Sequence, residues 1–177
     1  MHDTVKPPSG MVRIGNAGLV LAHPFLPMLF GRLDLLVSSD EGAPQLRGEQ
    51  RARAVHLLQY LVDGRSDAPD AQLVLNKLLC GLEADFPAPP VILRQEEQLL
   101  CDQLLAAIIE HWHSIGKTSI TGLRETFLQR EGRLQWDDGQ CTLTLQRAAF
   151  DVLLDRLPWS IAVIRQPWMR QALQVSR

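Results

Sequence analysis

The segment IGNAGLVLAHPFLPMLF, from Ile14 to Phe30, constrains the fold of this chain more than any other stretch. It has the apolar content of a buried element, yet Pro24 and Pro27 interrupt it and the ionisable His23 lies in its middle. A proline inside a helix removes a backbone hydrogen bond and clashes with the preceding turn, at a cost of about 3 kcal/mol. The segment is also shorter than the ~20 apolar residues that span a bilayer. It therefore predicts a kinked element that either packs in a core or docks on another subunit.

The composition is that of a folded domain without an electrostatic surface for nucleic acid. The chain has 177 residues, of which 46% are hydrophobic and 21% are charged, and its formal net charge is -2. This length is enough for one domain with a real core, and no basic run marks a nucleic-acid site. The first residues, MHDTVKPPSG, include the acidic Asp3 and lack a signal-peptide pattern, which predicts a cytoplasmic protein.

Hydrophobic periodicity predicts a mainly helical fold with about five or six helices. The longest is expected over residues 95–115, with Leu99, Leu104 and Ile108 on its buried side and Glu96 and Glu97 facing outward. Shorter helices are expected over residues 49–62, 70–82, 120–130 and 149–159.

The pattern changes to alternation after residue 132. RLQW and CTLTLQ flank Asp137-Asp138-Gly139, which predicts a hairpin, and SIAVIRQPWM is expected to form a third strand. The predicted fold class is therefore α+β, mainly α-helical, with a small C-terminal antiparallel sheet. We expect a flexible N-terminal arm over residues 1–13 and a single compact module over residues 14–177, helical over 14–131 and with the sheet plus a helix over 132–170.

The candidate catalytic and metal motifs are incomplete. Gly116-Lys117-Thr118 has the ending of a phosphate-binding loop, but His111 stands where that loop requires a glycine. His111 and His113 are two residues apart on a predicted helix, so their rings point roughly 200° apart and cannot easily share one ion. Neither a serine nor a cysteine has the surroundings of an activated nucleophile. We therefore expect no catalytic residues, no cofactor and no metal, and we expect the cysteines to be buried thiols: Cys80, Cys101 and Cys141.

Two proline-tryptophan dipeptides, Pro158-Trp159 and Pro167-Trp168, lie nine residues apart in the C-terminal part of the chain. Tryptophan and methionine are enriched in the buried centres of protein interfaces. Core packing and a partner surface both remain open for these residues. Together with the first segment they give the predicted partner interface: His23, Pro24, Phe25, Pro27, Phe30, Pro158, Trp159, Pro167, Trp168 and Met169.

Five blocks of unusual sequence follow one another along the chain: IGNAGLVLAHPFLPMLF, RAVHLLQYLVDG, LVLNKLLCGL, GLRETFLQREGRL and FDVLLDRLPWSIAVIRQPWM. In this order, and over nearly the whole chain, they resemble the contractile injection system tape measure protein family. Members of this family belong to phage-tail-like machines in which a sheath drives an inner tube through a target envelope. The resemblance implies a structural component that is assembled inside the cell, and it carries over no active site.

The length of the chain qualifies what this resemblance implies. A wholly helical chain of this length would reach only ~270 Å, and a compact domain of this size has a radius of gyration of ~16 Å. We therefore expect the family's shared module without an evident ruler, acting as an adaptor at a tube end, cap or baseplate. The alternative is a cytoplasmic chaperone or cargo-loading module that is absent from the finished particle.

The expected partners are other proteins of the injection system, from the tube, cap or baseplate. The ring symmetry of such machines also allows a homo-oligomer. Neither nucleic acid nor membrane insertion is expected. Assembly is expected in the cytoplasm, whether the particle is later released or anchored to a membrane.

Overall fold

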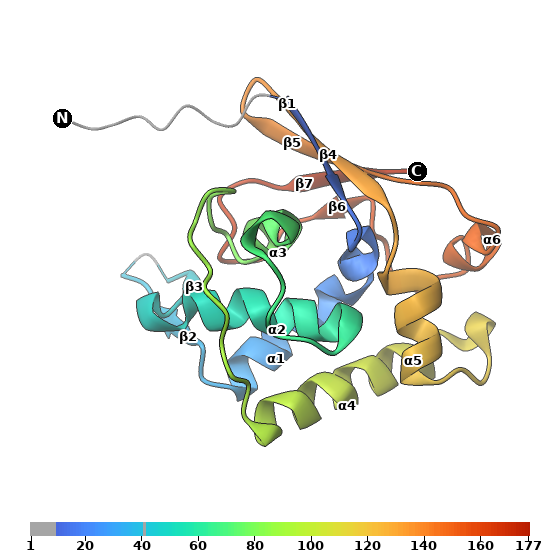
Figure 1. Cartoon of the computed structure of the whole chain (residues 1–177), viewed down its shortest axis with the longest axis horizontal. Coiled ribbons are helices and arrows are strands. Elements are labelled where there is room, and N and C mark those ends of the chain that lie inside the picture. The colour runs from blue at the N-terminus through green and yellow to red at the C-terminus, as the bar shows by residue number, and fades with distance from the viewer. Residues whose placement is uncertain (1–9, 41) are drawn as a thin grey trace.

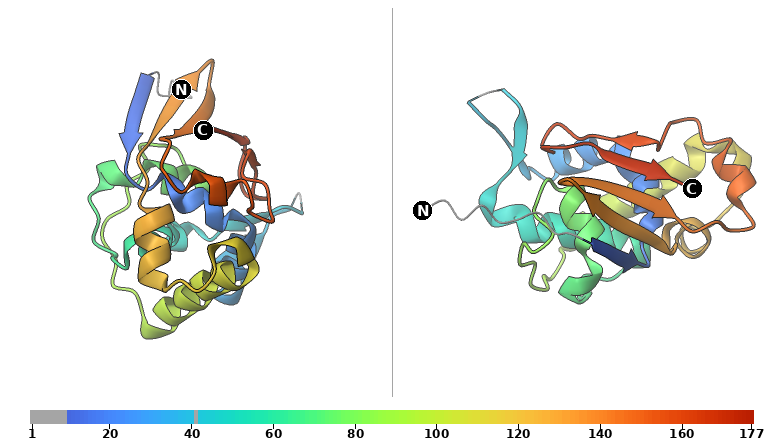
Figure 2. Two further views of the ribbon diagram at one scale, coloured as in Figure 1. Left: turned by 90° about the vertical axis from the view of Figure 1, so that its right-hand side faces the viewer. Right: turned by 90° about the horizontal axis from the view of Figure 1, so that it is seen from above.

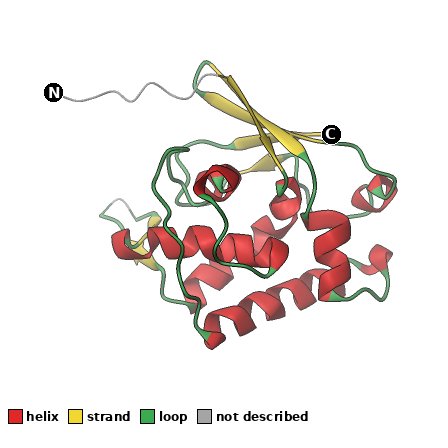
Figure 3. Cartoon of the chain, in the orientation of Figure 1, coloured by secondary structure: helices red, strands yellow, loops and turns green. Residues whose placement is uncertain are grey.

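A computed structural model describes residues 10–40 and 42–177 of the chain. A five-stranded sheet lies on one side of a layer of helices, and a separate two-stranded sheet stands at one end of that layer (Figures 1 and 3). The core lies between sheet and helices, where the inward-facing Leu134, Leu143 and Leu145 of the sheet are buried. The other face of the five-stranded sheet has no described helix on it (Figure 2).

The large sheet has the strand order β1-β4-β5-β7-β6. Every neighbouring pair is antiparallel except β5 and β7, which run parallel. In the small sheet, β2 pairs with β3. The strands are β1 (Gly10–Ile14), β2 (Leu36–Ser38), β3 (Pro44–Leu46), β4 (Gly132–Asp137), β5 (Gln140–Leu145), β6 (Val163–Ile164) and β7 (Leu173–Ser176).

The sheet makes the predicted fold class wrong. Strands account for 17% and helices for 44% of the residues, and the five-stranded sheet is mixed and includes β1 from the start of the chain. It is therefore neither small nor C-terminal nor antiparallel throughout. Local alternation revealed the β4–β5 hairpin, whose turn residues Asp138 and Gly139 have positive φ. It could not reveal that β1 pairs with β4, because that partner lies more than a hundred residues away.

The predicted N-terminal arm falls partly outside the described residues. Residues 1–9 of the predicted stretch 1–13 are not described, and the remainder belongs to β1. The expected strand over residues 160–169 is reduced to β6, and β7 was not anticipated.

The helical layer contains six α-helices among the described residues, together with short 3₁₀ turns and one π-helical turn. None of these helices is long and apolar enough to cross a membrane. They are η1 (Ala17–Phe25, 3₁₀), α1 (Leu26–Arg32), η2 (Gly48–Gln50), α2 (Arg51–Asp63), η3 (Asp70–Gln72), α3 (Val74–Leu79), α4 (Gln95–His111), η4 (His113–Ile115), α5 (Ile120–Leu123), η5 (Arg124–Leu128, π) and α6 (Asp151–Leu154).

The 3₁₀ helix η1 lies at the centre of the molecule. It contacts helices α1, α2, α4 and η5 on one side and strand β5 on the other, and its residues 17–22 are all buried. 3₁₀ helices longer than three or four residues are uncommon, because their hydrogen bonds are poorly aligned. This one is nine residues long. It passes into α1 at Leu26, with Pro24 in its last turn and Pro27 in the first turn of α1.

A buried amide cluster fixes the start of η1 to the helices beneath it. Asn16 Nδ2 donates to Gln59 Oε1 at 3.0 Å and to Asn76 Oδ1 at 2.7 Å. Asn76 Nδ2 in turn donates to the Val55 carbonyl at 3.1 Å. All three amide side chains are at least 95% buried. The cluster joins η1, α2 and α3 through directional bonds that an apolar core does not supply.

Helix α4 buries Leu104 and Ile108 as predicted, but the edge of its buried side differs from the one that its apolar residues predict. Leu99 is 56% exposed, whereas Glu97 is 1% exposed and shares the buried side with Cys101 and Leu104. The burial of Glu97 is possible because two guanidinium groups neutralise it. Arg53 Nη1 lies 2.8 Å from Glu97 Oε2, and Arg94 Nε lies 2.7 Å from Glu97 Oε1.

The close packing of η1 gives a first prediction. A Cβ added at Gly18 would lie 1.8 Å from the Phe127 carbonyl oxygen and 2.6 Å from Leu128 Cα, so the backbone would have to move. We expect Gly18→Ala to lower the free energy of unfolding by about 3 kcal/mol, the upper end of typical overpacking costs. The control is Gly31→Ala in α1, where no atom lies within 4 Å of the added Cβ. It should raise stability by about 0.5 kcal/mol in the same urea titration, and equal losses in both variants would contradict the packing argument.

A second prediction concerns the buried carboxylate of α4. Replacing Glu97 with Gln keeps the shape of the side chain but removes the charge that Arg53 and Arg94 contact, so we expect a loss of about 1–3 kcal/mol. The neighbouring Glu96 is exposed and forms no ion pair with any residue of the part that the structure describes, so Glu96→Gln should change stability by less than about 0.5 kcal/mol. Urea denaturation of the two single variants measures the difference.

Candidate functional site

Two segments that are far apart in the sequence pack against each other beside η1. One is the proline-bearing stretch 21–30, and the other, residues 158–169, contains both Pro-Trp dipeptides and is called here the Pro-Trp segment. Trp159 Nε1 donates to the Leu21 carbonyl at 3.0 Å. The Trp159 ring also meets the Phe25 ring edge-on, with centroids 5.3 Å apart.

The Leu21 carbonyl needs this donor because of Pro24. In a 3₁₀ helix the N–H of residue 24 would donate to the carbonyl of residue 21, but proline has no N–H. A buried carbonyl without a partner is costly, and the indole of Trp159 supplies the missing hydrogen bond.

The same relation holds for Pro27. In an α-helix the N–H of residue 27 would donate to the carbonyl of His23. That carbonyl instead accepts the backbone N–H of Leu26 and the side chain of Gln166, whose Nε2 lies 2.6 Å away. Each proline in the first segment thus has a matching side-chain donor in the Pro-Trp segment.

The side chain of His23 ties the segments together in the opposite direction. Its Nε2 lies 2.7 Å from the Ser160 carbonyl oxygen. A carbonyl only accepts, so Nε2 carries the proton of the neutral ring. Burial lowers the pKa of His23 below its ordinary value, and the hydrogen bond to Ser160 opposes that shift only in part.

The second Pro-Trp dipeptide caps another helix. Trp168 Nε1 donates to the carbonyl of Leu79, the last residue of α3, at 2.8 Å. Carbonyls at helix ends have no partner within the helix, so this bond satisfies one of them. The indole also packs on Phe30 with ring centroids 5.2 Å apart. Gly81 has φ 74° and lies so close to the Trp168 carbonyl that an added Cβ would come within 2.4 Å of it.

The structure brings the residues of the predicted partner interface together, but they differ in accessibility. Phe30, Trp168 and Met169 are buried in the core. His23, Phe25 and Trp159 are half-buried in the contact between the two segments, and the four prolines are exposed: Pro24, Pro27, Pro158 and Pro167. A partner could therefore reach chiefly the prolines and the outer edges of the half-buried rings.

Sequence reasoning missed three residues of this contact. Each of the three hydrogen bonds between the two segments has one of them as a partner: Gln166, Ser160 and Leu21. The available signal was the missing N–H of each proline, which requires a donor from somewhere. The residues that supply these donors lie 138 and 143 positions away along the chain, and no local sequence pattern identifies them.

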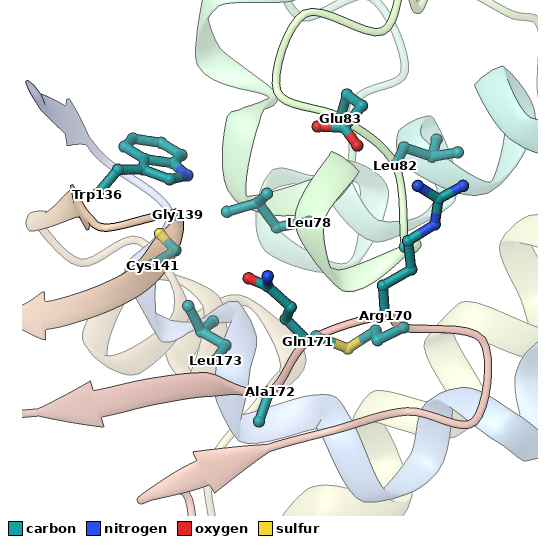
Figure 4. A pocket seen from close by; sticks show the side chains of 12 residues that line it. Leu78, Leu82, Glu83, Trp136, Gly139, Cys141, Arg170, Gln171, Ala172 and Leu173 are labelled. Carbon is teal, nitrogen blue, oxygen red and sulfur yellow. The ribbon is translucent and has the colours of Figure 1, made fainter. Parts of the chain in front are cut away.

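A cavity of about 290 Å³ lies between α3 and the end of the large sheet (Figure 4). Figure 4 shows Glu83 and Arg170 on one side of it and Trp136 and Cys141 on the other, with Leu78 between them. The charged groups are thus separated from the thiol. Burial raises the pKa of Cys141 to about 12, so its thiol stays protonated at neutral pH and is a poor nucleophile.

The thiols of the two remaining cysteines also have raised pKa values. Burial is the main cause that raises the pKa of Cys101 to about 12, and burial also raises the pKa of Cys80. Within residues 10–40 and 42–177, no three His, Cys, Asp or Glu side chains are close enough together to hold a metal ion.

The described residues are thus held together by hydrogen bonds and packing between segments that are distant in the sequence. The family described as contractile injection system tape measure protein matches residues 2–176, and the chain belongs to this family. The resemblance seen in the five sequence blocks is confirmed. No curated protein and no solved structure matches the chain. Family membership gives the chain a structural or assembly role in a contractile injection system, in association with its other components.

The lowered pKa of His23 gives a prediction about pH. The folded protein disfavours the protonated ring, so its contribution to stability is full above the unfolded pKa of about 6.5 and is lost as the pH falls below that value. His23→Gln keeps a donor near the position of Nε2 but does not titrate. We expect the wild-type protein to lose more unfolding free energy than the variant between pH 7.5 and pH 5.5, by urea denaturation. The other histidines are common to both proteins, so equal losses would show that His23 is not responsible.

Proposed function

We propose that this chain is a compact adaptor of the injection system that acts at an end of the inner tube, at a cap or at the baseplate. The observation that carries the proposal is that one family match covers residues 2–176 while the described residues fold into a two-layer unit. Its longest helix, α4, has 17 residues and rises about 26 Å. A ruler must extend along the tube that it measures, and no described element has that form.

A rigid, partly apolar surface beside the Pro-Trp segment supports a docking role. The exposed prolines have a fixed φ, and the bonds of Trp159 and Gln166 hold the backbone beneath them. A surface that is already ordered loses little entropy when a partner binds. In this proposal the partner contacts the exposed residues of the predicted partner interface, and the buried aromatic rings hold them in place. These exposed residues are Pro24, Pro27, Pro158 and Pro167.

The surface continues from Pro27 onto helices α1 and α4. Met28 is 47% exposed and borders a shallow cavity of about 190 Å³ between these helices, with Leu100 and Ala107 on the opposite side. Exposed apolar area next to a preformed backbone suits an interface that assembles with other particle proteins. We propose that this area contacts the tube, cap or baseplate, and that assembly takes place in the cytoplasm.

The proposal predicts the effect of one charge on this surface. Met28→Glu places a carboxylate on exposed apolar area, so it should leave the fold intact and lower the amount of the protein in purified particles by about tenfold or more. The control is Val37→Glu in the small sheet, which adds the same charge at a side chain that is 43% exposed. It should be incorporated like the wild type. Equal incorporation of both variants would remove this surface from the proposal.

The role itself is tested by deletion of the gene and mass spectrometry of the particles. An adaptor should be present in purified particles, and its loss should abolish particles or give sheaths of abnormal length. Particles of normal number and length would contradict the proposal. A protein that is required for assembly yet absent from finished particles would instead be a chaperone or a cargo-loading module.

A further inference from the structure

The outer face of the five-stranded sheet is uncovered by the described part of the chain and is rich in arginine. Side chains alternate along β4 and β5, so Leu134 and Leu143 enter the core while Arg133 and Thr144 point to the opposite face. Figure 2 shows this face from above with no helix in front of it.

The strand register lines up four polar side chains across this face. Arg13 of β1 is paired with Arg133 of β4, Arg133 with Thr144 of β5, and Thr144 with Ser176 of β7. We call this set the arginine row. The Thr144 and Ser176 hydroxyl oxygens lie 3.2 Å apart, so the row continues from two guanidinium groups into two hydroxyl groups.

No carboxylate of the described residues forms an ion pair with the two guanidinium groups of the arginine row. Like charges directly opposite each other on neighbouring strands are destabilising, and Arg13 and Arg133 are such a pair. Neither of them, nor the nearby Arg147, takes part in an ion pair within the described ranges 10–40 and 42–177. Arg177, which also lies here, is paired with Asp155.

A groove of about 420 Å³ runs along this cluster. Arg13, Arg133, Arg147 and Arg177 line it, and among the described residues Glu131 is its one acidic lining residue. The chain as a whole carries a formal net charge of -2, so the positive charge here is a local concentration and not a general property of the surface.

We propose that the arginine row binds an acidic segment of a partner protein. A carboxylate placed between Arg13 and Arg133 would turn their mutual repulsion into two attractive contacts, and guanidinium groups suit carboxylates because they can donate two parallel hydrogen bonds. The hydroxyl groups of Thr144 and Ser176 extend the row of donors. The groove lining contains no aromatic ring on which a base could stack, which favours an acidic peptide over single-stranded nucleic acid. The inference does not depend on the adaptor role, because this face is separate from the surface around Met28.

The binding test uses a fluorescein-labelled hexaglutamate peptide and the full chain, followed by fluorescence anisotropy. The double variant Arg13→Glu/Arg133→Glu should bind the peptide about tenfold or more weakly than the wild type. The control, Arg32→Glu/Arg51→Glu, reverses two exposed charges on helices α1 and α2 and should bind like the wild type. Raising the ionic strength from about 0.05 M to about 0.3 M should weaken wild-type binding, because salt screens exposed charges.

A stability measurement separates a binding role from a structural one. Arg133→Thr removes the like-charge pair and adds a residue that suits strands, so it should raise Tm by about 1–3 °C while it weakens peptide binding. If Arg133 instead stabilised the fold, Arg133→Thr would lower Tm.

Three results of the peptide measurements would overturn the proposal. They are absence of hexaglutamate binding, equal weakening by the control pair, and tighter binding of hexaglutamine than of hexaglutamate. Tighter binding of oligo-dT through the same two arginines would assign the face to nucleic acid and would also overturn it. A drop in Tm for Arg133→Thr would assign the row a structural role instead.

Discussion

The structure depends on hydrogen bonds that side chains of the C-terminal segment donate to two backbone carbonyls in the proline-bearing first segment. Pro24 cannot donate to the carbonyl of Leu21, and the side chain of Trp159 does so instead. The carbonyl of His23 accepts the backbone N–H of Leu26 and, in addition, the side chain of Gln166. Buried carbonyls must be satisfied, so the bend in the first segment requires the C-terminal segment in place. The unusual strings HPFLP and LPW…QPW are therefore two halves of one arrangement, which explains why both occur in one chain.

The element that contains these carbonyls, η1, is also closely packed. η1 is a narrow 3₁₀ helix, and Gly18 lets the backbone of Phe127 approach it where any side chain would collide. At its start, Asn16 bonds to Gln59 and Asn76, so the helix is fixed at both ends by polar contacts and along its length by packing. η1 contacts both strand β5 and the helices α1, α2 and α4, so it links the two layers of the fold.

Local sequence features were enough to predict several elements but not their pairing. The Asp138-Gly139 turn predicted the β4–β5 hairpin, and the helix expected over residues 49–62 corresponds to α2. The sheet class was wrong because β1 acquires its partner over a long sequence separation. The buried side of α4 was predicted correctly at Leu104 and Ile108 but not at Glu97, because periodicity treats a glutamate as a surface residue, whereas Arg53 and Arg94 allow Glu97 to be buried. The candidate interface residues were brought together as a group, but only the structure shows that their aromatic members contact one another.

The position of β1 has a consequence for how the chain folds. Its partner β4 begins at Gly132, and the side-chain donors for Leu21 and His23 come later still, so η1 lacks its full set of contacts until residues 132–166 have been made. Contacts between residues this distant are slow to form, because a long loop has to close before any of them is gained. The apolar stretch 14–30 is therefore synthesised well before the residues that satisfy its carbonyls. Until those residues are in place the stretch exposes apolar surface, which favours misassembly.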